Sequence, residues 1–434
     1  FSMIIGSNLN NSSVTGGTIN ITIPGSRNAY LNTTVPLWNL NFISSSTTYR
    51  GQIQAYAGNS SPPIPAIPAQ TLIVKNDLNV SNRAIFNANG NDVTVGRNFN
   101  VDAGSEYETG NNTTTFNGQT GQRFTNAGTM NNGTGIYNLV IADSSNTEIY
   151  SAALILRGSL TIGSSGIMND VGHPVMVAGD IFNSGTHVSQ AGGSVILNGG
   201  GNQLIGGSGM GQFDNLTLNK ASGTTTLQAS QSVTGNLRLA SGILDIENYN
   251  LTLGPQSNVY DALSGTTSAF SATKMIRLAG NHSDPGVTRI FDSPVSFLFP
   301  VGTGTDYTPV TTAFSSAPTQ WGSVSVGPVS LTHPFATSPS LLSYYWVVTS
   351  QGFSGIPAGS VSHTFRYQTA DITGSEAAYI PAVYRPYAWA PFNDNSRVVD
   401  ATNTILFPSE NIIDGNYTAG ELSAFSSLKV FYSR

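Results

Sequence analysis

The side chains that could carry chemistry in this chain are acids, histidines and one aromatic segment. Polysaccharide lyases and hydrolases need carboxylates clustered along one face. The acids considered for such a role do not recur at the 21-residue step of the chain's repeats, so they would not stack into a cleft: Asp92, Asp102, Glu106, Asp143, Asp170 and Asp180. We expect solvated carboxylates in turns and predict that the chain is not an enzyme.

Metal sites are not predicted either. The histidines are not paired at ligand spacing with one another: His173, His187, His282, His333 and His363. Cysteine is absent, which excludes thiolate ligands and disulfides. The segment Asn393-Asp-Asn-Ser396 has closely spaced oxygen ligands but lacks the Gly and later Glu of an EF-hand loop, so we expect a turn there. No metal or cofactor is predicted, and His363 is expected on a strand face beside Phe365.

The best binding candidate is the aromatic segment from Tyr384 to Phe392. Its candidate site residues are Tyr384, Arg385, Tyr387, Trp389 and Phe392. Tyr and Trp can stack on sugar rings, and Arg385 could bond a hydroxyl or a carboxylate. The alternative is that these rings pack in a core, with Trp389 buried. A carbohydrate or partner site and core packing both remain open from the sequence.

Composition limits the partners. Only 9% of the residues are charged and the net charge is −6, with no basic stripe, so no nucleic-acid partner is expected. Surface polarity must come from Asn, Ser, Thr and Gly, which favour turns and strands. No apolar run reaches the roughly 18 residues of a membrane span. The chain starts at Phe1, and we expect a mature or trimmed piece of a longer product.

The elements that must position these residues are repeats. Apolar-x-apolar triplets open three similar stretches: Leu78-Asn-Val80, Leu160-Thr-Ile162 and Leu237-Arg-Leu239. Matching triplets follow each of them: Val93-Thr-Val95, Val175-Met-Val177 and Leu251-Thr-Leu253. The period of two predicts short strands, and clusters of Gly, Asn and Ser separate them. Such strands bury a face only when copies stack.

A second motif sets the length of one coil. Leu139 to Leu160 and Leu216 to Leu237 are both steps of 21 residues, whereas Leu40 to Leu78 is 38. The excess predicts an insertion at about residues 48–68, where a proline-rich segment lies. A third correspondence aligns Asn-Gly118 and Gln122 with Asn-Gly199 and Gln203.

These patterns predict an all-β chain with a right-handed parallel β-helix of about 21 residues per coil, followed by a C-terminal antiparallel β-sandwich. We expect an N-terminal cap or strand over 1–29, the β-helix over 30–270 and the β-sandwich, possibly immunoglobulin-like, over 271–434. Strands are expected near Val324, Tyr344–Val348, Val361–Tyr367, Thr404–Phe407 and Leu428–Tyr432. A series of small sandwiches fits less well, because it has no 21-residue inner step.

Several segments resemble very large secreted surface proteins of Bacteroidota. The repeats Asn215-Leu-Thr-Leu-Asn-Lys220 and Asn250-Leu-Thr-Leu-Gly254 are similar to theirs. So are Phe299-Pro-Val-Gly302 and Gly415-Asn-Tyr-Thr-Ala-Gly420 in the C-terminal part. The resemblance implies export by the type 9 secretion system and a role in adhesion, gliding or surface assembly.

The function predicted from these observations is a structural segment of an extracellular, cell-surface protein, acting as a stiff adhesin or spacer. Its partners would be cell-surface or extracellular polymers and proteins, or other copies of itself. One alternative is a subunit of a surface filament joined by strand addition through Phe1–Ile5 and Leu428–Tyr432. Another is a carbohydrate-binding or polysaccharide-degrading β-helix protein.

Overall fold

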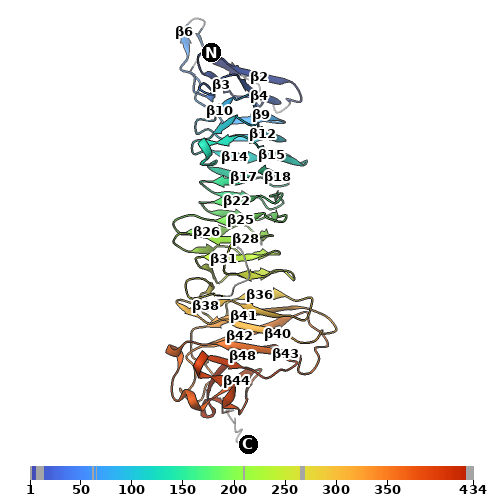
Figure 1. The fold of residues 1–434 in the computed structure, drawn as a ribbon, viewed down its shortest axis with the longest axis vertical. Helices are drawn as coiled ribbons and strands as arrows, with labels where there is room; N and C mark the ends of the chain where they lie inside the picture. The colour runs from blue at the N-terminus through green and yellow to red at the C-terminus, as the bar shows by residue number, and fades with distance from the viewer. Residues whose placement is uncertain are drawn as a thin grey trace, which may run out of the picture. The chain divides into compact units, whose positions relative to one another are not determined.

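The computed structural model describes residues 2–5, 14–60, 63–64, 66–208, 211–263 and 269–426. The chain forms two compact units, residues 1–217 and 218–434. Figure 1 shows the strands from which they are built. Strands dominate both units, in keeping with the all-β prediction. The helical turns among the described residues are all short 3-10 turns: η1 (Asn131–Gly133), η2 (Thr369–Asp371), η3 (Glu376–Ala378), η4 (Asn395–Arg397), η5 (Asp400–Thr402) and η6 (Leu422–Phe425).

Unit 1 is a parallel β-helix. One of its sheets contains β1 (Ser2–Ile5), β3 (Ala29–Thr33), β5 (Arg50–Ile53), β10 (Ile85–Asn87), β13 (Glu106–Glu108) and β16 (Thr129–Met130). A second contains β2 (Thr18–Ile23), β4 (Asn39–Ser44), β9 (Leu78–Ser81), β12 (Asn98–Val101), β15 (Gln122–Asn126), β18 (Asn146–Ser151), β21 (Ile167–Asn169), β24 (Thr186–Val188) and β27 (Gly211–Phe213). A third contains β8 (Leu72–Val74), β11 (Val93–Val95), β14 (Thr113–Phe116), β17 (Asn138–Ile141), β20 (Leu160–Ile162), β23 (Ile181–Asn183) and β26 (Gln203–Gly206). A further one contains β19 (Leu154–Leu156), β22 (Pro174–Val177) and β25 (Ser194–Leu197).

The register confirms the predicted coil length. Leu139 pairs with Leu160, so one coil is about 21 residues. Leu40 pairs with Leu78 despite the longer step, because the extra residues leave the stack and return. This excursion is a hairpin of β6 (Asn59–Ser60) and β7 (Pro63–Ile64). It begins after Ile53, later than the expected residue 48, because β5 pairs with strands on both sides.

The parallel pairing starts earlier than the predicted residue 30. Strand β2 pairs with β4 from Thr18↔Asn39 to Ile23↔Ser44, and β1 pairs with β3. The residues of β2 alternate, with Ile21 and Ile23 buried and the polar residues between them exposed. The segment 1–29 therefore supplies strands of the β-helix itself.

Inward-pointing side chains form the core of unit 1. Rings from successive coils contact one another: the centroids of Phe42 and Phe86 are 4.4 Å apart and those of Phe99 and Phe124 are 5.3 Å apart. In another sheet of unit 1, aliphatic side chains such as Leu160 and Ile181 stack on one another in register and are fully buried. Burying each such side chain contributes roughly 1.5–3 kcal/mol.

The repeated Gln residues make the same contacts in both copies of the third motif. Gln122 accepts a hydrogen bond from Gly118 N at 2.9 Å and donates to Val95 O at 3.0 Å. Gln203 makes the equivalent bonds to Gly199 N and Val177 O, at 2.9 and 3.0 Å. Both Gln side chains are buried, so they satisfy backbone groups that water cannot reach. Glycine is required beside them, because a Cβ on Gly118 would lie 1.9 Å from the oxygen of Gly96.

A ladder of Asn side chains runs over the outer face of β2, β4, β9 and β12. Asn41 donates to Asn20 at 2.8 Å, Asn79 to Asn41 at 2.8 Å, and Asn100 to Asn79 at 2.7 Å. The two inner amides, Asn41 and Asn79, both donate and accept, as in stacked Asn ladders of other β-structures. Side-chain hydrogen bonds therefore connect these neighbouring strands on the polar outer face, in addition to the apolar contacts on the inner face.

Unit 2 begins with parallel strands and changes to antiparallel ones. The parallel strands are β28 (Leu216–Asn219), β29 (Thr225–Leu227), β30 (Gln231–Val233), β31 (Leu237–Ser241), β32 (Leu244–Glu247), β33 (Leu251–Leu253), β34 (Val259–Tyr260), β35 (Ile276–Leu278), β36 (Val287–Ile290) and β38 (Val301–Thr303). Strand β35 pairs in parallel with β38, so parallel pairing continues past residue 270. The repeat is hard to see there because a long connection separates Leu253 from Ile276.

Two antiparallel sheets follow. One joins β36 to β41 (Ser323–Val329), β42 (Tyr345–Gln351), β48 (Gly415–Glu421), β44 (Tyr379–Arg385) and β45 (Ala388–Pro391). The other contains β37 (Ser296–Phe299), β40 (Val310–Phe314), β43 (Val361–Arg366), β47 (Thr404–Leu406) and β46 (Val398–Val399), and β39 (Asp306–Tyr307) pairs with β38. The strand predicted over 428–432 lies outside the described residues.

Contacts between the two antiparallel sheets make a sandwich core. The ring centroids of Trp346 (β42) and Phe365 (β43) are 4.9 Å apart, and those of Tyr417 (β48) and Phe365 are 5.1 Å apart. All three are buried. The Trp346 indole donates to Thr308 O at 3.0 Å, so its polar atom is satisfied inside the core. A C-terminal sandwich is thus present, as the sequence predicts.

Candidate functional site

The predicted aromatic segment is a hairpin of β44 and β45. Tyr387 lies at its tip, is 95% exposed and has a positive φ of 72°. Trp389 is only 7% exposed and packs against Phe425 at 4.9 Å. Phe392 contacts Phe407 edge to face at 5.7 Å. The five candidate residues therefore do not form one exposed face.

Arg385 is committed to partners within the protein. Its guanidinium is paired with Glu410, and its Nε donates to Asp414 O at 3.3 Å. Burial lowers the pKa of Arg385, but the interactions with Glu410 and Tyr417 together outweigh it, and the pKa lies above its ordinary value. A sugar hydroxyl would have to compete with an ion pair for this side chain.

Sequence reasoning missed Phe335, which lies beside the hairpin. Its ring is 51% exposed and stacks on Tyr384, with centroids 4.9 Å apart and an interplanar angle of 19°. The Trp389 indole donates to Phe335 O at 2.8 Å, which fixes this segment against β45. An exposed aromatic stack is thus present, made from Phe335 and Tyr384. Nothing in the sequence around Phe335 indicates that it lies near the hairpin.

A buried histidine sits beneath this stack. The centroid of the His333 ring lies 4.7 Å, 4.8 Å and 5.0 Å from the ring centroids of Trp389, Tyr345 and Tyr384. Its Nε2 is 3.0 Å from the amide nitrogen of Asn416. Burial, with a smaller contribution from nearby His282, lowers the pKa of His333 to about 4. The ring is therefore neutral at physiological pH and acts as part of the core.

His363 lies on a strand face beside Phe365, as predicted. Its Nδ1 is 3.0 Å from the Thr312 hydroxyl, and the side chain is 4% exposed. Burial lowers the pKa of His363 to about 3, with Arg385 adding to the effect. The segment at Asn393–Ser396 is a turn in which Asp394 accepts from Ser396 N at 3.2 Å.

Asp170 differs from the expected solvated turn carboxylate. It is fully buried and accepts hydrogen bonds from Ser189 Oγ at 2.7 Å, His187 Nε2 at 3.0 Å and Gly172 N at 2.9 Å. Burial raises the pKa of Asp170, but the bonds from His187 and Ser189 outweigh it and the pKa lies below its ordinary value. Sequence spacing gave no signal for this pair. Asp170 directly follows β21 and His187 lies in β24, and the parallel pairing of these two strands brings the residues together.

The Asp170 cluster does not have the geometry of a catalytic triad. Ser189 donates to the Asp170 carboxylate and not to the His187 imidazole, so the Ser–His contact of a triad is not made. His187 is also fully buried, and its Nδ1 has no hydrogen-bond partner in the part of the chain that the structure describes. The cluster is best understood as a polar contact that holds two turns of unit 1 together. Among the described residues, no group of three or more acids, His or Cys could hold a metal ion.

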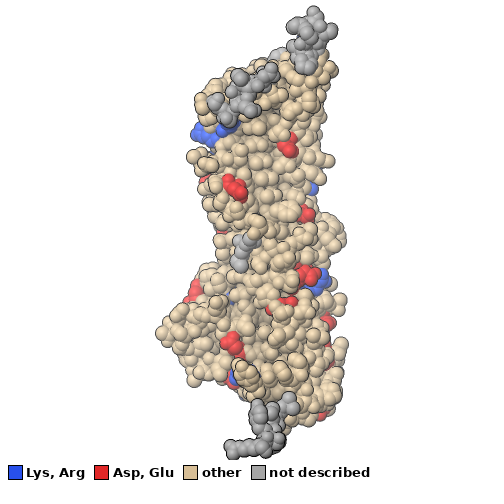
Figure 2. Space-filling model, turned by 180° about the vertical axis from the view of Figure 1, so that it is seen from behind, with Lys and Arg blue, Asp and Glu red and all other residues tan. Residues whose placement is uncertain are grey.

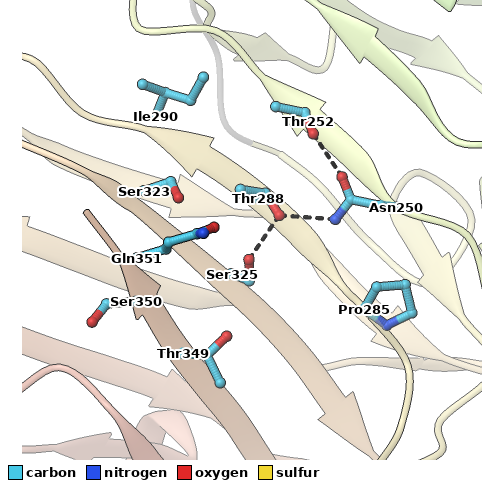
Figure 3. A pocket seen from close by; sticks show the side chains of 10 residues that line it. All are labelled: Asn250, Thr252, Pro285, Thr288, Ile290, Ser323, Ser325, Thr349, Ser350 and Gln351. Atoms are coloured by element: carbon cyan, nitrogen blue, oxygen red, sulfur yellow. Dashed lines mark hydrogen bonds between the residues drawn. The ribbon is translucent and has the colours of Figure 1, made fainter. Parts of the chain in front are cut away.

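The outer face of unit 2 carries an uncharged groove of about 600 Å³ (Figure 3). Strands β33, β36, β41 and β42 supply most of its lining: Asn250, Thr252, Pro285, Thr288, Ile290, Ser323, Ser325, Thr349, Ser350 and Gln351. Its volume is within the range of sites for small ligands. Elsewhere on the surface, Figure 2 shows acidic and basic side chains scattered over one face without a patch of either sign.

None of the helical turns in the described parts of the chain is long and apolar enough to cross a membrane. No protein-family model, no curated protein and no solved structure matches this chain.

Proposed function

We propose that this chain is a structural segment of an extracellular surface protein and acts as a stiff adhesin or spacer. The observation that carries the proposal is the construction of the unit 1 coils. Each coil hydrogen-bonds to the next in its sheets and packs against it inside, and over β2, β4, β9 and β12 the Asn ladder adds bonds on the outer face. Such coils resist bending because all of these contacts would have to change together.

The resemblance to Bacteroidota surface proteins supports the same proposal. It implies a place at the cell exterior, export by the type 9 secretion system and a role in adhesion or surface assembly. Partners would be extracellular polymers, surface proteins or further copies of the chain. A surface dominated by Asn, Ser and Thr suits contact with hydrated polymers, because it offers many hydrogen bonds and few charges to desolvate.

Adhesion under load tests the proposal. The chain has no Cys, so one terminal Cys attaches it to beads in a single orientation. We expect coated beads to be retained on bacterial cells or extracellular polymer under flow, above beads carrying an unrelated protein of similar charge. Pulling on the same chain should give no stepwise extension below the force at which beads detach. Retention equal to the control, or coils that unfold before detachment, would contradict the proposal.

Electron microscopy separates the filament alternative. Discrete particles of the purified chain are expected for a spacer. Ordered filaments that grow with concentration would instead favour a polymer joined by strand addition.

A further inference from the structure

The groove of unit 2 lies where the parallel strands give way to the antiparallel sheet. Strand β36 pairs in parallel with β33 and antiparallel with β41. Four hydroxyl side chains follow one another across the strands in register: Thr252 opposite Thr288, Thr288 opposite Ser325, and Ser325 opposite Thr349. Neighbouring strands are about 4.8 Å apart, so the row presents evenly spaced hydroxyls.

Part of this row is held in place by the protein itself (Figure 3). Thr252 donates to the Asn250 oxygen at 2.6 Å, and the Asn250 amide donates to Thr288 at 2.8 Å. Thr288 and Ser325 share one further bond of 2.7 Å. That bond uses one of their two hydroxyl hydrogens, whichever residue donates, so the other hydrogen is left for the groove.

Further hydrogen-bonding capacity is unused. Among the described residues, the side chains of Ser323, Thr349 and Gln351 have no hydrogen-bond partner. Thr349 and Gln351 are exposed and Ser323 is half-buried. These groups both donate and accept, and they surround the pre-positioned Thr288–Ser325 pair.

The lining selects for an uncharged ligand. None of the ten lining residues is acidic or basic; Asp414, which accepts from the lining residue Ser350 at 2.9 Å, is not among them. The exposed side chain of Ile290 adds apolar contact. Alternating hydroxyl and C–H surfaces are the chemistry of a pyranose chain. We propose that this groove binds a segment of a neutral polysaccharide.

The inference rests on the proposed function for its setting and gives the adhesion a ligand class. It places the ligand in the groove and not on the Phe335–Tyr384 stack, which is the other candidate sugar-binding site in unit 2. Titration calorimetry of the full chain with cellohexaose, laminarihexaose and maltohexaose tests it, with a charged oligogalacturonate as the counter-probe. We expect at least one neutral hexasaccharide to bind and the charged one not to bind.

Variants locate the binding. Thr349→Val removes an exposed hydroxyl without disturbing the core, and Thr288→Val removes the central hydroxyl. Each should weaken binding about 2- to 10-fold, the effect of one neutral hydrogen bond. The matched control is Thr161→Val, an outward-facing hydroxyl on β20 of unit 1, which should leave affinity unchanged. Thermal unfolding of each variant checks that it folds.

The outcomes are distinct. The proposal is overturned if no neutral hexasaccharide binds, if the charged one binds better, or if Thr349→Val and Thr288→Val bind like the unmodified chain. Binding that is abolished by Phe335→Ala but not by the groove variants would also overturn it, by assigning the ligand to the aromatic stack. If beads adhere although no sugar binds, the groove proposal is contradicted and the proposed adhesin function stands. If sugar binds but beads do not adhere, the adhesin function is contradicted and the groove proposal stands.

Discussion

The coils of unit 1 and the sandwich of unit 2 bury short strands by different means. The coils reuse a few positions: an inward aliphatic or aromatic side chain, a buried Gln such as Gln122, and an outward amide such as Asn79. The sandwich uses contacts that occur once, such as Trp346 on Phe365, and buries neutral His333 and His363. In the coils, many similar interfaces each contribute a small part of the free energy of unfolding. In the sandwich, a few contacts that occur once contribute a large part of it.

The largest effects should come from core truncations, and they should spread differently in the two regions. Trp346→Ala should lower the free energy of unfolding of the sandwich by about 3–5 kcal/mol, and Leu160→Ala should lower that of unit 1 by about 2–5 kcal/mol. Hydrogen exchange should rise across all strands of the sandwich in the first variant. In the second it should rise mainly in β17, β20 and β23, because each coil contacts only its neighbours.

Equal spreading in the two variants would contradict this comparison. A rise in exchange throughout unit 1 would show that its coils unfold as one unit. A rise confined to β42 would show that the sandwich is not cooperative.

Acid should destabilise the sandwich at a higher pH than the coils. The pKa of His333 falls from 6.5 unfolded to about 4 folded, and that of His363 to about 3. A lowered His pKa means that the unfolded state takes up protons first, so stability is complete above pH 6.5 and falls as the pH drops toward these values. His333 alone accounts for about 3 kcal/mol. In unit 1, Asp170 has a pKa below 3.8, so its contribution is lost only below that pH.

Tryptophan fluorescence can follow the two regions separately. Trp38 lies in unit 1, whereas Trp321, Trp346 and Trp389 lie in unit 2. A Trp38→Phe chain should therefore report unit 2 alone. The urea concentration at its unfolding midpoint should decrease when the pH is lowered from 7 to 4. His333→Gln should flatten that dependence. Asp371 opposes the trend, because burial raises its pKa, so a flat profile in both chains would show that the histidines do not control acid stability.

The same contrast explains what the sequence predicted. A 21-residue step predicted the coils, the pairing of Leu40 with Leu78 and the insertion between them. In a repeat, residues at a constant spacing occupy equivalent positions and pair with one another. Phe335 and Tyr384 lie far apart in the chain and meet through antiparallel pairing and loops that have no period. Asp170 and His187 also escaped prediction, since a buried acid–His pair leaves no periodic mark. Repeated positions are readable in one sequence, but contacts that occur once are not.

The Asn ladder gives the smallest and most local test. Asn79 stands in its middle and bonds both Asn41 and Asn100, whereas Asn20 bonds Asn41 alone among the described residues. Asn79→Ala should lower the free energy of unfolding of unit 1 by about 1 kcal/mol, because it removes two partly exposed hydrogen bonds. Asn20→Ala should cost about half as much.

Thr161→Ala on the outer face of β20 is the control for lost β-propensity alone. Urea unfolding followed through Trp38, in a chain whose three unit 2 tryptophans are all replaced by Phe, measures the three variants. If Asn79→Ala matches Thr161→Ala, the ladder bonds exchange with water at no net loss. In that case the coils owe their stability to the inner face alone, and the outer face is free to vary for binding.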